Sequence, residues 1–285
     1  MDSPPDKEPV DAFILIAQHL IKLGFNAPTI FAKDIQNGFL LLEDFGDNTF
    51  SQLLHTGYDA KKLYKLATDT LIALHKNTMI TAINAKPYDM ATYIQEVNLF
   101  VQWLYPSLTG KNLTPIEKSK WEMAWINALG KILPTRSTLV LRDYHAGNLM
   151  LLNGGNSSET CGLLDFQDAL IGNPAYDLLS LLEDVRLDIA PEVALENYRH
   201  YTNSMNTGKE FDTAYTVLSA QRHAKVLGIF VRLYKRDGKS NYLQYLPRTL
   251  SFFNRALEDE NLAPVKAWFN SHLPTFSYDL LNKKW

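Results

Sequence analysis

The segment from Leu139 to Asp177, LVLRDYHAGNLMLLNGGNSSETCGLLDFQDALIGNPAYD, constrains the fold more than any other part of the chain. Short apolar runs at 139–141, 149–152 and 161–164 predict three brief strands. The intervening residues 153–158 are typical of a hairpin turn. Three polar residues, Asp143, Asn148 and Asp165, follow or separate these apolar runs.

This order of polar residues is typical of phosphoryl transfer. The chemistry requires one group that orients an acceptor hydroxyl and accepts its proton, and hard oxygen ligands for the Mg²⁺ on the nucleotide phosphates. Asp143 has the residue type for the first role, and Asn148 and Asp165 for the second. The alternative is that Asp143 and Asn148 cap a turn while Asp165 begins a helix. The LLDFQD sequence after a hydrophobic hairpin favours the catalytic interpretation.

Here the chain resembles the aminoglycoside-phosphotransferase-like branch of the protein-kinase-like superfamily. LRDYHAGNLM and GLLDFQDALIGNPAYDLLSLLED are most similar to the sugar kinases that phosphorylate N-acetylmuramate and N-acetylglucosamine at the anomeric hydroxyl. MDSPPDKE, GFLLLEDFG at 38–46 and QRHAKVLGIFVRLYKRDGK at 221–239 extend the resemblance over nearly the whole chain. One departure is Leu141, which stands where many kinases have a packing histidine before the Arg-Asp pair.

The resemblance implies an α/β (α+β) class, namely a protein-kinase-like two-lobe fold with a truncated N-terminal lobe and a large, mainly helical C-terminal lobe. Residues 1–45 would be the remnant of the nucleotide-binding lobe and the hinge, and 46–285 the catalytic and acceptor-binding lobe. It also implies ATP and Mg²⁺ as cofactors and an amino sugar of cell-wall recycling as the acceptor. An aminoglycoside or choline-type small-molecule kinase, and a catalytically silent nucleotide-binding protein, remain alternatives.

The beginning of the chain departs further from that family. Pro4, Pro5 and Pro9 break both helix and strand, and no glycine-rich loop joins two strands in the sequence. The chain therefore resembles a family member without its first strands, either because an internal Met was taken as the start or because a short form exists. The first is favoured, since a truncated sheet would leave an open edge and exposed apolar surface.

The resemblance makes GFLLLED the hinge between the lobes, where backbone groups bind the adenine edge. Glu43, Asp44 and Phe45 would then lie against the base. The residues alone allow an ordinary strand that runs into a turn at Gly46 equally well.

Three residues near the catalytic positions are expected to support or extend the site. The resemblance implies that Asp177 braces the catalytic loop by accepting hydrogen bonds from loop amides. Arg142 is expected to form a structural ion pair. His145 is expected either to contact the substrate or to pack the loop, and Asp168 to be a surface or helix-capping carboxylate.

A basic stripe follows one face of the helix expected at 214–235, where Arg222, Lys225, Arg232 and Arg236 recur at helical spacing. Such a stripe is usually a solvated face. The alternative is that Arg222 and His223 reach the acceptor and bind a sugar carboxylate or acetamido oxygen, for which the planar guanidinium is well suited.

Apolar periodicity predicts the remaining elements. Thr114, Pro115 and Glu117 are a strong helix start signal, with a side-chain cap, a proline in the first turn and a glutamate that can reach back. The expected strands are Thr29 to Lys33 and Phe39 to Leu42, and the expected helices are 10–24, 61–75, 90–105, 114–133, 174–186, 214–235, 241–258 and 262–273.

Composition narrows the class of protein. The 285 residues are 46% hydrophobic, enough for a large core, and a net charge of −3 gives no electrostatic reason to expect nucleic acid. One cysteine excludes an internal disulfide. No apolar run approaches the roughly 18 residues of a membrane span, and the acidic, proline-rich start is unlike a targeting peptide. We expect a cytoplasmic protein with a small sugar as its partner and without an obligate protein partner.

Overall fold

The computed structural model describes residues 1–4, 10–133, 137–153, 159–274 and 276. Contacts divide the chain into two compact units, each made of two separate stretches. The first unit comprises Met1–Pro87 and Arg136–Thr207, and the second Tyr88–Thr135 and Gly208–Trp285. The lobe boundary expected near residue 45 concerns nucleotide binding and stays a prediction.

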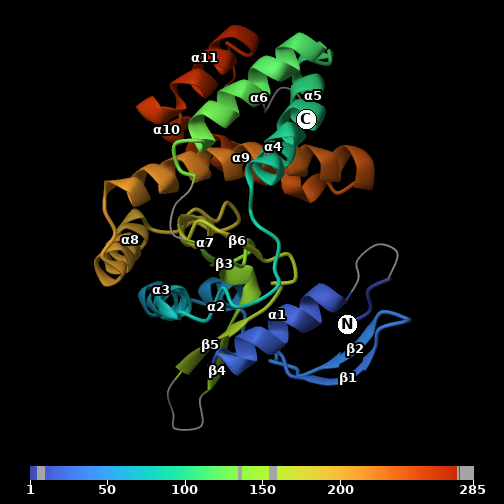
Figure 1. Ribbon diagram of the computed structural model, residues 1–285, viewed down its shortest axis with the longest axis vertical. Coiled ribbons are helices and arrows are strands. Elements are labelled where there is room, and N and C mark those ends of the chain that lie inside the picture. The colour runs from blue at the N-terminus through green and yellow to red at the C-terminus, as the bar shows by residue number, and fades with distance from the viewer. Residues whose placement is uncertain (5–9, 134–136, 154–158, 275, 277–285) are drawn as a thin grey trace. The chain divides into compact units, whose positions relative to one another are not determined.

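The first unit contains all the strands in the described residues, arranged as three antiparallel pairs (Figure 1). The pairs are β1 (Ile30–Asp34) with β2 (Phe39–Leu42), β3 (Thr138–Val140) with β6 (Leu170–Gly172), and β4 (Leu149–Asn153) with β5 (Glu159–Leu163). The five predicted strands are confirmed within one or two residues at each end. β6 was not predicted, and the turn predicted at 153–158 falls mostly outside the described residues.

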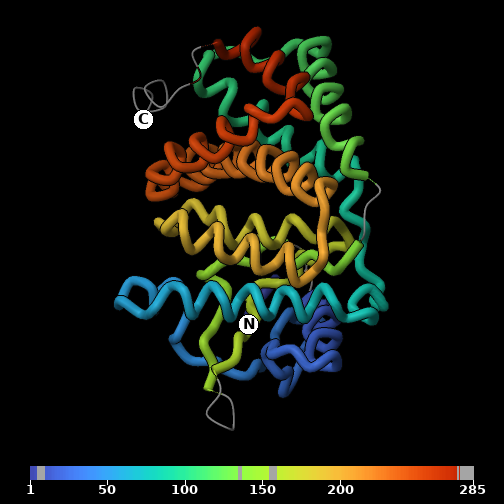
Figure 2. The backbone as a smooth tube through the Cα atoms, turned by 90° about the vertical axis from the view of Figure 1, so that its left-hand side faces the viewer, coloured from blue at the N-terminus to red at the C-terminus, as the bar shows by residue number. Residues whose placement is uncertain are grey.

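Helices make up the rest of the regular structure in the described residues of the first unit. They are α1 (Asp11–Lys22), α2 (Phe50–His55), α3 (Ala60–Lys76), α7 (Ala175–Leu182) and α8 (Pro191–Met205), and a 3₁₀ turn spans Ala146–Asn148. α3 and α8 run side by side (Figure 2) and share buried polar contacts. Thr68 Oγ1 donates to Asn197 Oδ1 at 2.8 Å, and His75 Nδ1 lies 2.6 Å from the Tyr201 hydroxyl.

In the described residues of the second unit, every element of regular secondary structure is helical. The elements are α4 (Met90–Leu99), a π-helical turn (Phe100–Leu104), α5 (Tyr105–Thr109), α6 (Pro115–Leu129), α9 (Lys209–Asp237), a 3₁₀ turn (Ser240–Tyr245), α10 (Leu246–Ala256), a 3₁₀ turn (Glu260–Leu262) and α11 (Ala263–His272). Trp121 and Trp125 of α6 are fully buried, as expected for core residues. The capping box predicted at Thr114 and Glu117 is present.

Gly228 explains one departure from the predicted helices. α4 gives way to the π-helical turn at Phe100 instead of continuing as one α-helix to residue 105. A Cβ atom placed at Gly228 of α9 would lie 2.3 Å from the backbone carbon of Leu99 and 2.6 Å from the Phe100 nitrogen. The two backbones therefore touch at the point where α4 changes from α-helical to π-helical geometry.

Other helix ends differ from the predictions for local reasons. α7 ends at Leu182 rather than 186, because Asp184 Oδ1 accepts the Arg186 amide at 3.0 Å and offers the backbone an alternative to the helix. The helix expected at 241–258 begins as a 3₁₀ turn and becomes α10 near Pro247. No helix in the described ranges is both long and apolar enough to cross a membrane.

Candidate active site

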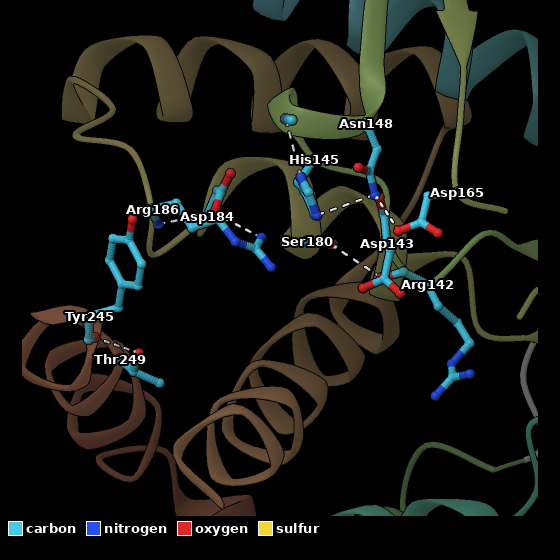
Figure 3. Close-up of polar contacts among 11 residues, drawn as sticks. Arg142, Asp143, His145, Asn148, Asp165, Ser180, Asp184, Arg186, Tyr245 and Thr249 are labelled. Atoms are coloured by element: carbon cyan, nitrogen blue, oxygen red, sulfur yellow. Dashed lines mark hydrogen bonds and ion pairs between the residues drawn. The ribbon is translucent and has the colours of Figure 1, made fainter. Parts of the chain in front are cut away.

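The predicted catalytic residues lie together in the first unit. Asp143 follows β3 in the loop before the 3₁₀ turn, Asn148 ends that turn, and Asp165 follows β5. Asn148 Nδ2 donates to the Asp143 backbone carbonyl at 3.0 Å and to Asp165 Oδ2 at 3.1 Å (Figure 3). One amide group therefore links the loop that carries the expected base to the loop that carries the expected metal ligand.

These two hydrogen bonds define what Asn148 can offer a cation. In both hydrogen bonds Nδ2 is the donor, so the carbonyl oxygen Oδ1 is the side-chain atom that remains as a metal ligand. Asp165 is exposed, and Gln167 Nε2 steadies its Oδ1 at 2.8 Å. An amide oxygen and a carboxylate on neighbouring loops are hard donors of the kind that Mg²⁺ prefers, so these residues fit that ion.

Asp177 fixes the backbone of the catalytic loop through hydrogen bonds. Its side chain is completely buried, and it accepts the backbone amide of Leu141 at 2.6 Å and that of Arg142 at 2.8 Å. These are the loop-amide hydrogen bonds expected of Asp177. Ser180, one turn further along α7, donates to the Arg142 carbonyl at 3.3 Å. This second brace was missed, although its spacing of three residues from Asp177 places it on the same helix face.

Arg142 has an unusual backbone. Its φ angle is +69°, in the left-handed region that non-glycine residues rarely adopt. Its guanidinium donates to the Asp168 carbonyl at 3.3 Å and lies 3.8 Å from the Asp168 carboxylate. The structural ion pair expected of Arg142 is therefore present, and it ties the Asp143 loop to the segment after Asp165.

Aromatic packing supports the loop that carries Asp165. Phe166 is fully buried and stacks on Phe13 of α1, with ring centroids 5.0 Å apart. Tyr144, beside Asp143, is also buried, and its hydroxyl donates to the Ala67 carbonyl at 2.7 Å. Burial raises the pKa of the Tyr144 phenol well above its ordinary value, so this hydroxyl is a neutral structural donor.

The expected hinge lies beside the β4–β5 hairpin. Leu151 of β4 donates its amide to the Asn48 carbonyl at 2.9 Å. The Phe45 ring covers Gly162 of β5 so closely that a Cβ there would lie 3.0 Å from two ring carbons. Glu43 Oε2 accepts from the Thr29 hydroxyl at 2.7 Å, and Asp44 Oδ1 accepts the Gly46 amide at 2.8 Å. These carboxylates organise their own turn, and contact with adenine stays a prediction.

The basic stripe of α9 is not a solvated face along its whole length. Arg222, His223 and Lys225 are buried, whereas Arg236 is exposed. Lys225 Nζ forms an ion pair with Glu96 of α4 at 2.9 Å. The solvated interpretation is therefore wrong for the first turns of the stripe.

His223 has a contact within its own helix. Its Nδ1 lies 2.7 Å from the Ser219 carbonyl, to which it donates. Contact of Arg222 and His223 with an acceptor stays a prediction, because both belong to the second unit while Asp143 belongs to the first.

The fold and the linked loops are those of a kinase-type phosphotransferase, and the sequence comparisons agree. Residues 1–212 match the phosphotransferase enzyme family. The chain belongs to this family.

Relatives with assigned names lie within that family. The chain is 32% identical to the N-acetylmuramate/N-acetylglucosamine kinase of Caulobacter vibrioides, over 93% of this chain and 75% of the relative. It is 34% identical to proteins of the same name from Pseudomonas aeruginosa, over 90% and 76%, and Neisseria meningitidis serogroup B, over 94% and 81%. The resemblance proposed from the motifs is confirmed.

Solved structures show the same fold at low sequence identity. A choline/ethanolamine kinase family protein from Mesorhizobium loti superposes with a TM-score of 0.62 at 14% identity, over 89% of this chain and 82% of that one. The gentamicin complex of the aminoglycoside phosphotransferase APH(2")-IIa gives 0.57 at 17% identity, over 88% and 81%. The expected combination of small sheets and a large helical part is confirmed.

Proposed function

We propose that the protein transfers the γ-phosphoryl group of ATP to the anomeric hydroxyl of N-acetylmuramate or N-acetylglucosamine. The names of its relatives support this acceptor, and their identity to this chain of 32–34% extends over at least 90% of its length. Such a reaction consumes ATP and recovers cell-wall sugar. We expect it to take place in the cytoplasm.

The observation that carries the proposal is the double hydrogen bond of Asn148. Its side-chain amide fixes the Asp143 backbone and the Asp165 carboxylate relative to each other. A phosphoryl-transfer site depends chiefly on positioning and charge stabilisation. The link between the two loops provides that positioning within one compact unit.

Each residue of the link has a separate role in the proposal. Asp143 orients the acceptor hydroxyl and accepts its proton. Asn148 Oδ1 and the Asp165 carboxylate hold Mg²⁺, which neutralises charge on the phosphates when it is bound. The backbone around Glu43, Asp44 and Phe45 receives the adenine.

The anomeric hydroxyl suits a carboxylate base. It is more acidic than an ordinary alcohol, so transfer of its proton to Asp143 demands less basicity. Arg222 is the proposed partner for the carboxylate that distinguishes N-acetylmuramate from N-acetylglucosamine, because a guanidinium binds a carboxylate through two parallel hydrogen bonds.

The test is phosphorylation of both sugars with ATP and Mg²⁺, with the position of the new phosphate read by ³¹P NMR. Replacement of Asp143 by Asn should lower kcat by about 10²- to 10⁴-fold, the usual contribution of a positioned base. Glu196→Gln is the matched control, because Glu196 forms an exposed ion pair with Lys61 on the surface.

Three outcomes would contradict the proposal. Sugar phosphorylated at another hydroxyl would refute the anomeric assignment. Turnover of an aminoglycoside or of choline in place of the amino sugars would assign the same catalytic residues to a different acceptor, and nucleotide binding without any turnover would favour a silent binding protein.

A further inference from the structure

His145 lies between the expected base and the expected metal ligand and begins the 3₁₀ turn Ala146–Asn148. Its Nδ1 lies 3.2 Å from the backbone nitrogen of Gly147 (Figure 3). Its own carbonyl accepts the Asn148 amide at 2.8 Å. The side chain and the backbone of His145 therefore both hold the turn that carries Asn148.

The hydrogen bond with Gly147 determines the protonation of the ring. A backbone N–H can only donate, so Nδ1 must be the unprotonated acceptor, and the neutral ring carries its proton on Nε2. Nε2 lies 3.3 Å from Asn148 Nδ2. The two side chains are therefore in direct contact (Figure 3), and the imidazole ring limits the rotation of the Asn148 amide.

The ring has little surface with which to meet an acceptor. His145 is 6% exposed. A Cβ atom at Gly147 would lie 3.2 Å from both Cε1 and Nδ1 of the ring, so the ring lies directly against the Gly147 backbone. The close contact with Gly147 and the hydrogen bond from its amide together hold the His145 ring against the 3₁₀ turn.

We propose that His145 is a positioning residue for Asn148: its Nδ1 caps the 3₁₀ turn and thereby aims Asn148 Oδ1 at the nucleotide-bound metal. This inference rests on the proposed function. It assigns His145 to metal and nucleotide binding in place of contact with the sugar. Residues that orient a metal ligand in this way commonly contribute about 10- to 100-fold to metal affinity.

The geometry suggests a pair of variants for the test. In asparagine, Oδ1 occupies the same bonded position as Nδ1 in histidine, and it accepts an amide two residues ahead in an ordinary Asx turn. Leucine places a methyl group there and cannot accept. His145→Asn should therefore restore what His145→Leu removes.

The experiment measures binding of Mg²⁺·ADP and of ADP with EDTA by calorimetry, and then KM for N-acetylmuramate. For His145→Leu we expect the Mg²⁺·ADP affinity to fall by about tenfold or more, with metal-free ADP binding and the sugar KM unchanged. His145→Asn should bind Mg²⁺·ADP within about threefold of the unmodified protein. Exchange of the Gly147 amide hydrogen should accelerate in the leucine variant alone.

Each other outcome has a defined meaning. If the leucine variant binds Mg²⁺·ADP normally while the sugar KM rises, His145 contacts the acceptor and the inference is wrong. The inference is also wrong if His145→Asn has a normal melting temperature but does not restore Mg²⁺·ADP binding. In that case the hydrogen bond accepted by Nδ1 would not be the cause of the lost affinity. If the unmodified protein binds no Mg²⁺·ADP, the proposed function itself fails, and the metal-positioning role with it.

Discussion

The Asp177 carboxylate holds Arg142 in a left-handed backbone conformation. Oδ1 accepts the Arg142 amide at 2.8 Å, at a residue whose φ angle is +69°. Backbone strain of this kind costs on the order of 1–3 kcal/mol and persists only where surrounding interactions enforce it. The buried Asp177 carboxylate supplies such an interaction through its hydrogen bond to Arg142, the residue that precedes Asp143.

Replacement of Asp177 by Ala should therefore destabilise the protein and reduce turnover together. The buried Leu141 amide and the partly buried Arg142 amide would lose their acceptor, at about 1–3 kcal/mol each. Urea denaturation measures the loss of stability. Ser180→Ala is the comparison, because it removes a single 3.3 Å hydrogen bond to the Arg142 carbonyl and should have a smaller effect. Equal losses for the two variants would show that Asp177 has no special role.

The stacking of Phe13 on Phe166 gives a second prediction. Phe13→Leu should lower kcat and leave the sugar KM unchanged, because it loosens the loop that carries Asp165 without touching the acceptor. Loss of an aromatic pair destabilises by about 0.5–1.5 kcal/mol beyond the buried area. The control is Leu15→Ala on the same helix, where Leu15 is 41% exposed. A drop in kcat for the control as large as for Phe13→Leu would contradict the prediction.

The buried pair of Glu96 and Lys225 gives a third prediction. Their side chains are 8% and 10% exposed. Lys225→Met should destabilise the protein by about 3–5 kcal/mol, because Glu96 would keep a buried charge without its cation. The double variant Glu96→Gln/Lys225→Met should recover much of this loss. Thermal and urea unfolding measure the loss of stability in the single variant and its recovery in the double variant.

The exposed pair of Lys61 and Glu196 is the matched comparison for that experiment. Its side chains are 62% and 59% exposed. Lys61→Met should change stability by less than about 1 kcal/mol, since water screens the lost interaction. A loss at Lys225 no greater than that at Lys61 would mean that the buried pair contributes little.

Cys161 should be unreactive in the folded protein. Burial raises the pKa of its thiol from 9.0 to about 12. Because the folded-state pKa is the higher one, the contribution of the neutral thiol to stability is complete below pH 9 and is lost as the pH rises toward 12. Iodoacetamide at pH 8 should modify Cys161 only after urea unfolding. Rapid modification without urea would show that the β4–β5 hairpin opens.

Local spacing explains why much of the site could be predicted from the sequence. Asp143 and Asn148 are five residues apart in one loop, and Asp165 follows a strand that pairs with the strand after Asn148. Their proximity follows from a single hairpin. The helix cap at Thr114 is likewise set by neighbouring residues and was predicted in full.

Contacts between distant parts of the sequence explain what was missed. Burial of Lys225 depends on Glu96, 129 residues earlier, so the stripe was expected to be solvated. β6 is three residues long and is defined by pairing with β3 rather than by any pattern of its own. The π-helical turn at Phe100 depends on the absence of a side chain at Gly228 on another helix. The Nδ1 cap of His145 is local, but histidine is not among the residues usually expected to form such turns.

Asn26 bears on how the chain folds as it is synthesised. Its carbonyl accepts the Leu163 amide at 2.8 Å, and its side chain donates to the Cys161 carbonyl 135 residues later. A nascent chain therefore cannot complete the edge of the β4–β5 hairpin until Leu163 has left the ribosome. Contacts of such long sequence separation slow folding. During translation, Phe13 of α1 and Asn26 must wait for their partners at residues 161–166, so this interval is the period in which the growing chain would most need a chaperone.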